Sequence, residues 1–134
     1  MMDYISEKYP DDSFEFMNLT GGHLGSEDTK IYVRSRKYPD KEIKVICWHS
    51  GEKEIFTDTY LNIKFEQQTR DYIKNALVGQ FGDDVYAHYK PPSLGNMEDG
   101  TAQTTFEEYI SSETTYVRFS AAIVLDDISE EQPR

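Results

Sequence analysis

Cys47 and His49 are the residues whose types and spacing most directly suggest chemistry. They lie two positions apart in a segment that reads as a strand, so both side chains point to the same side. A thiol beside an imidazole can form an activated nucleophile. The same side also carries Ile43 and Val45, and buried cysteines are common in protein cores. We therefore favour a core cysteine followed by a half-exposed histidine, and keep a small Cys/His hydrolase as the open alternative.

The remaining histidines do not form a metal-binding pattern. His23, His49 and His88 lie in three separate segments, with no i, i+4 pair and no Cys-x-x-Cys. The sequence therefore predicts neither a metal nor another cofactor. The glycine-rich segment 20–28 lacks the Gly-Lys-Ser/Thr ending of a phosphate loop, so we expect it to connect two strands.

Adjacent carboxylates recur along the chain, and paired carboxylates can perform glycosidase chemistry when they face each other in a cleft. Here neighbouring residues at turns and on surface helices point apart, so we interpret them as solvated. The pairs are Asp11-Asp12, Asp83-Asp84, Glu107-Glu108 and Asp126-Asp127.

One predicted hairpin combines basic and aromatic side chains. Tyr32, Arg34 and Arg36 alternate with Ile31 and Val33, and Trp48 shares a face with Lys44 and Ile46. Such a surface can bind a ligand or a protein partner. We predict that the binding residues are Tyr32, Arg34, Arg36 and Trp48. The alternative is an ordinary solvated sheet face covered by Tyr and Arg side chains.

Composition limits the possible partners. The chain has 134 residues and a formal net charge of −11, which argues against nucleic acid or an anionic membrane and leaves a basic partner possible. Cys47 is the only cysteine, so no intramolecular disulfide can form.

No stretch approaches the ~20 apolar residues of a membrane span. The residues from Met1 to Tyr4 do not resemble a signal peptide, so we expect a cytosolic chain or the mature part of an exported protein.

Periodicity predicts the elements that must position these residues. A long helix is predicted over residues 56–77, with Thr57 or Asp58 as its N-cap and its end near Gly79 or Gly82. Its buried stripe would consist of Leu61, Phe65, Gln68, Tyr72 and Ala76, widened by Ile73 and Leu77. Alternation predicts strands over 13–19, 29–37, 42–49, 54–57, 84–90 and 114–125, the last being the longest. Short helices are expected over 3–9, and over 104–111 with Thr104 and Glu107 as a capping box.

Several segments in this order resemble a domain family of small lipoproteins and surface proteins from clostridia and related Firmicutes. The resemblance rests on Tyr4–Tyr9, Phe14–Phe16, Gly21-Gly22, Ile31–Val33, Asp58–Thr69 and Phe81–Asp83. No established activity comes with that family. The resemblance implies a setting on the outside of a Gram-positive cell, anchored by a lipid if a leader was removed.

Together these observations predict a single α+β domain over residues 1–125, followed by an acidic, disordered tail over 126–134. Its antiparallel sheet would have four to five strands, with one long helix packed across one face and short accessory helices. The function we expect is that of a non-catalytic binding module, for an unknown protein or small surface ligand. The alternative is an acidic immunity or inhibitor protein that neutralises a basic toxin.

Overall fold

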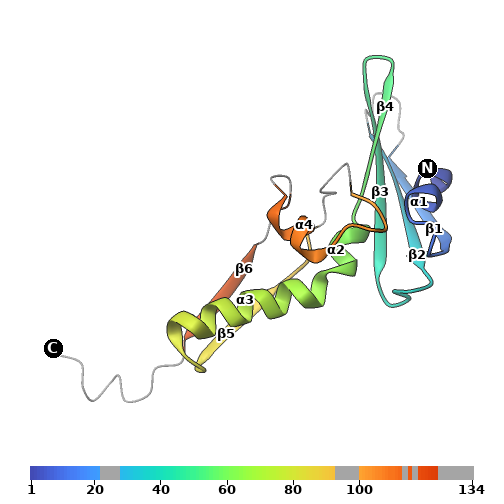
Figure 1. Ribbon diagram of the computed structural model, residues 1–134. Coiled ribbons are helices and arrows are strands. Elements are labelled where there is room, and N and C mark those ends of the chain that lie inside the picture. Colours follow the sequence, from blue (N-terminus) through green and yellow to red (C-terminus); the bar gives the residue numbers. More distant parts are fainter. Residues whose placement is uncertain (22–27, 93–99, 113–114, 116–117, 124–134) are drawn as a thin grey trace, which may run out of the picture.

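The computed structural model describes residues 1–21, 28–92, 100–112, 115 and 118–123, and they form a mixed α+β structure (Figure 1). The elements are α1 (Met2–Lys8), β1 (Phe14–Gly21), β2 (Asp28–Ser35), β3 (Glu42–Ser50), β4 (Lys53–Asp58), α2 (Tyr60–Lys64), α3 (Glu66–Phe81), β5 (Val85–Tyr89), α4 (Phe106–Ser111) and β6 (Phe119–Ile123).

The predicted fold class is confirmed. Strands β1, β2, β3 and β4 form an antiparallel sheet in sequence order, and β5 pairs antiparallel with β6 in a second sheet. The alternation predicted for β2 and the first half of β3 holds, because Ile31, Val33, Ile43 and Val45 are buried while Arg34 and Glu42 are exposed. It fails at Ile46, which was expected on the outer face with Lys44 and Trp48 but is buried. Edge strand β1 is interrupted by a bulge between Phe16 and Asn18.

One face of the four-stranded sheet carries the main core. Ile5 and Tyr9 from the α1 region pack against the buried residues of β2 and β3, and Tyr60 and Leu61 of α2 join the same cluster. Phe65 and Tyr109 complete it. Because both helices occupy this face, Tyr32 and Arg34 of β2 lie on the opposite face, which is the one the sequence assigned to binding.

The long helix differs from its prediction. Residues 56–58 belong to β4, and the helical part is broken at Phe65 (φ −100°, ψ 11°) into α2 and α3. Asp58 still supports the helix start, because its Oδ1 accepts a hydrogen bond from the Tyr60 N–H at 2.9 Å. Gly79 lies inside α3, and Gly82, at φ +82°, ends it.

The break changes which side of the helix is buried. Glu66, Thr69 and Ile73 are the buried residues of α3, whereas the predicted stripe residues Gln68, Tyr72 and Ala76 are exposed. Figure 1 shows α3 running away from the four-stranded sheet, with β5 and β6 beside it. α3 packs on β5, and Arg70 Nη2 donates to the Tyr89 carbonyl oxygen at 3.2 Å.

Two predictions in the C-terminal part need correction. The capping box of α4 is formed by Thr105 and Glu108, one residue later than expected. The last strand begins at Phe119 and not at residue 114, because Arg118 is outside the strand; residues 114, 116–117 and 124–125 of the predicted strand lie outside the described residues. Residues 124–134, which include the predicted tail, lie outside the described residues.

Candidate functional site at the end of the β2 strand

The structure divides the four predicted binding residues between two places. Tyr32 lies opposite Lys44 in the β2–β3 ladder and Arg34 lies opposite Glu42, whereas Trp48 lies opposite Asp28 near the other end. Six positions separate Trp48 from Glu42 along β3, which is about 20 Å at the rise of a strand. Trp48 is therefore too far from Arg34 for one small ligand to contact both side chains.

Tyr32 forms the inner part of this surface. Its half-buried ring has the Lys44 ammonium 6.0 Å from the ring centroid, at the limit of a cation–π contact. Because the neighbouring positions on β2 are buried in the core, the backbone under Tyr32 is held firmly.

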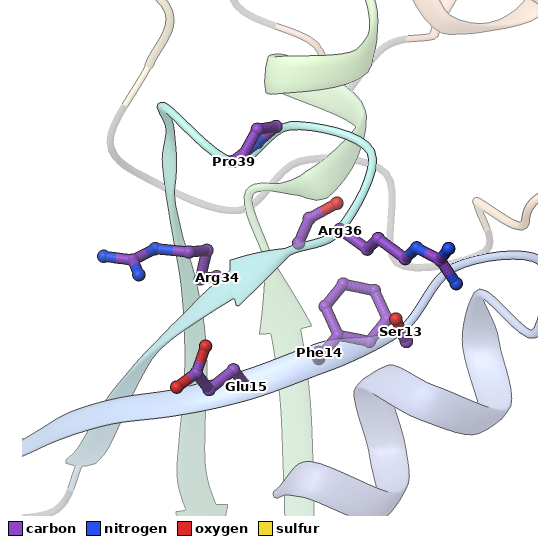
Figure 2. Close-up of a pocket in the computed structure, with 7 residues that line it drawn as sticks. Ser13, Phe14, Glu15, Arg34, Arg36 and Pro39 are labelled. Atoms are coloured by element: carbon purple, nitrogen blue, oxygen red, sulfur yellow. The ribbon is translucent and has the colours of Figure 1, made fainter.

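Arg34 and Arg36 border a hollow of about 340 Å³ at the end of β2 (Figure 2). Figure 2 shows their guanidinium groups pointing away from each other, with the Phe14 ring between them. Both arginines are exposed, and neither makes an ion pair with a described residue. Arg34 lies between Glu15 and Glu42 in the ladder without bonding to either. The hollow therefore has two cationic groups that point apart, and they do not converge on one anion.

Asp12 holds this end of the sheet together. It accepts hydrogen bonds from the Ser35 hydroxyl and from the Tyr60 hydroxyl at 3.0 Å, so it joins β2 to α2. The Ser13 and Lys37 N–H groups donate to its Oδ1 at 2.7 and 3.2 Å. Desolvation raises the pKa of the Asp12 carboxyl, but these hydrogen bonds outweigh it and leave the pKa below its usual value. The prediction that Asp12 is simply solvated was wrong.

A second hollow adjoins the first, and Arg36 belongs to both. It measures about 450 Å³ and is lined by Pro10, Asp11, Asp12, Ser13, Arg36 and Lys37. Carboxylates therefore line this second hollow, and Glu15 lines the first. The surface at this end of the sheet carries both signs of charge.

The structure does not favour Cys47 as a nucleophile. Cys47 is 6% exposed, and burial, assisted by Glu54, raises the pKa of its thiol, which disfavours the reactive thiolate. His49 is exposed and its Nε2 lies 3.5 Å from Glu54 Oε1. The geometry thus matches the core cysteine that the sequence favoured.

No metal centre is found in the part of the chain that the structure describes, where no three His, Cys, Asp or Glu side chains gather. His23 lies outside the described residues. None of the described helices is both long and apolar enough to cross a membrane.

A buried polar cluster, which no motif in the sequence predicted, surrounds Asp58. Its Oδ2 accepts from the Tyr4 hydroxyl at 2.7 Å and from Lys8 Nζ at 3.0 Å, and its Oδ1 accepts from the Tyr9 hydroxyl at 3.0 Å. Asp58 lies opposite Val45 at the end of β4, so the cluster fixes α1 to the sheet. No cavity opens onto it among the described hollows. We interpret it as structural.

Comparison of the chain with protein-family models, curated proteins and solved structures finds no match.

Proposed function

We propose that the chain is a non-catalytic binding module whose contact surface is the end of the four-stranded sheet around Arg34 and Arg36. The observation that carries this proposal is the pair of exposed arginines at a 340 Å³ hollow, neither with an ion-pair partner among the described residues. The chain has 25 acidic and 14 basic residues, so carboxylate partners are plentiful, yet these two guanidinium groups remain available. Arginine side chains are frequent at the centres of protein interfaces.

Tyr32 extends this surface along β2. A half-buried tyrosine adds contact area at low entropic cost, because its ring is already held by its neighbours. Trp48 would take part only with a partner large enough to span about 20 Å of the sheet face. If all four predicted residues make contact, the partner must be a protein or another extended molecule. If only Arg34 and Arg36 make contact, a small ligand is sufficient.

The test is capture of partners from the source cells by the full chain, quantified by mass spectrometry. The Arg34→Ala/Arg36→Ala variant should lose the partner that the wild type retains. The Lys53→Ala/Lys74→Ala variant removes the same charge from two exposed positions elsewhere and should keep it. Equal loss in both variants, or retention in the arginine variant, would contradict the proposal. Far-UV circular dichroism should confirm that both variants are folded.

A second candidate is an acidic inhibitor of a basic protein such as a toxin, and the net charge of −11 favours it. Asp83, Asp84 and Glu107 are exposed and have no ion pair with a described residue. Replacing these three by Asn, Asn and Gln should then weaken capture, and binding should fall steeply with salt. Capture that depends on the two arginines and not on these carboxylates would favour the first candidate.

The resemblance to lipoproteins and surface proteins is the only support for an extracellular setting, which we propose on that basis. The mass and N-terminus of the protein from membrane and soluble fractions of the native cell would test it. A lipid-modified, membrane-associated form is expected. Recovery of unmodified protein in the soluble fraction alone would overturn this setting and move the inhibitor candidate ahead.

A further inference from the structure

A third hollow lies on the second sheet and is lined differently from the two at the end of β2. It measures about 420 Å³ and is bordered by His88, Lys90, Pro91, Arg118, Phe119 and Ser120. None of these residues is acidic, although the chain has 25 acidic residues among 134. By contrast, each of the hollows beside Arg36 contains at least one carboxylate.

The strand register brings the basic groups together. His88 lies opposite Ser120, and Tyr89 lies opposite Phe119 in the β5–β6 ladder. Lys90 directly follows β5 and Arg118 directly precedes β6, so both lie at the same end of this sheet, and both border the hollow. Two positive charges at the same hollow repel each other. Neither Lys90 nor Arg118 has an ion pair with a described residue that would offset this repulsion.

The basic groups also face outward. Val85 and Tyr89 are buried beneath α3, so the alternation of the strand places Tyr86, His88 and Lys90 on the other side, where all three are exposed. Figure 1 shows that α3 lies along one side of this two-stranded sheet. A sheet of only two strands is marginally stable in water. An anion bound at the hollow would lower the repulsion between the two cations.

We infer that this hollow binds the oxyanion group, phosphate or carboxylate, of a small ligand. Arg118 supplies a planar guanidinium that can bind two oxygens at once, and Lys90 supplies a second positive charge. The Ser120 hydroxyl and the His88 imidazole are further hydrogen-bonding groups at the same hollow. Phe119 also borders the hollow, but it lies opposite Tyr89, so its side chain projects to the α3 side of the sheet. This site lies on a different sheet from Arg34 and Arg36 and does not depend on the proposed function.

The inference is tested by titrating the ¹⁵N-labelled full chain with sodium phosphate, and separately with sodium succinate, while sodium chloride keeps the ionic strength constant. We expect saturable shifts in the amide signals of His88, Lys90 and Ser120. Lys90→Ala and Arg118→Ala should each weaken the affinity about tenfold, because each removes a charge-assisted hydrogen bond. Lys74→Ala, which removes one exposed positive charge from α3, should bind like the wild type.

The two anions distinguish the source of the oxyanion. Saturation by phosphate alone assigns a phosphoryl group, and saturation by succinate alone assigns a carboxylate. The inference is overturned if neither anion shifts these signals beyond sodium chloride at equal ionic strength. It is also overturned if Lys90→Ala and Arg118→Ala bind as tightly as the wild type. The wild-type titration decides the matter even if a variant fails to fold, and Arg34→Ala/Arg36→Ala should leave this binding intact.

Discussion

Lys8 on α1 forms an ion pair with Asp58 at the end of β4, with Nζ 3.0 Å from Oδ2 and with side chains that are 10% and 1% exposed. The two residues are 50 positions apart in the chain. Two tyrosine hydroxyls and one backbone N–H also donate to the same carboxylate. The pair therefore fixes the N-terminal helix to the sheet through hydrogen bonds that leave Asp58 fully partnered.

Replacing Asp58 by Asn should destabilise the protein by about 3 kcal/mol, because it leaves the largely buried Lys8 cation without its counter-charge. Urea denaturation followed by circular dichroism measures the change. Lys74→Ala, on the exposed side of α3, should stay within about 0.5 kcal/mol of the wild type. A similarly small change for Asp58→Asn would show that the pair contributes little.

Acid should destabilise the protein partly through Asp12, whose pKa is lowered in the folded state. As the pH falls through the usual value near 3.8, the unfolded chain takes up a proton at Asp12 before the folded chain does. The stability from Asp12 is present above that pH and is lost as the pH falls toward the lowered folded value. Asp12→Asn should therefore flatten the dependence of unfolding free energy on pH below about 4. An unchanged slope would contradict this role.

Alkali should destabilise the protein through its buried tyrosines. Burial raises the pKa of Tyr9 and Tyr60, and the nearby carboxylates Asp58 and Asp12 raise it further. Above the usual value of 10.0 the unfolded chain loses these protons first, so the stability falls as the pH rises. Ultraviolet titration of phenolate formation should show tyrosines that ionise only on unfolding. Complete ionisation near pH 10 without unfolding would be the contrary result.

Cys47 should react slowly with iodoacetamide at pH 7.5 in the native protein and readily in urea. The thiol is 6% exposed and its pKa is raised, so both access and thiolate formation are disfavoured. Mass spectrometry of timed samples gives the two rates. Rapid native alkylation would restore the Cys47/His49 hydrolase as a serious alternative.

The sequence predicted the sheet well because β2 and β3 follow a simple period. Ile31, Val33, Ile43 and Val45 alternate with polar residues, and the pleat of a strand makes that pattern unambiguous. The short turn over 38–41 then left an antiparallel pairing of the two strands as the simplest connection.

The helix could not be predicted equally well, because polar residues help to form its buried side. Glu66 is buried with Lys41 and Arg70 as partners, and the Thr69 hydroxyl donates to the Phe65 carbonyl oxygen at 2.8 Å. Hydrophobic periodicity does not count such residues, so it favoured the side that carries Tyr72 and Ala76, and Gln68 was assigned to that side by its position alone.

The candidate site was predicted in part. Tyr32 and Arg34 share an outer face as expected, but their separation from Trp48 follows from the pairing register, which spacing within one strand does not reveal. The basic hollow on β5 and β6 joins residues about thirty positions apart, which only the paired strands bring together.

The pair between Lys8 and Asp58 also bears on how the chain folds as it is made. The ribosome produces α1 first, but its anchoring carboxylate follows 50 residues later. At about 5–20 residues per second, this gap corresponds to roughly 3–10 s of elongation. During that time α1 has no counter-charge for Lys8 and no completed sheet to rest on. The ion pair between Lys8 and Asp58 can therefore form only after β4 has been synthesised, whereas Ile5 and Tyr9 pack on residues of β2 and β3, which are made earlier.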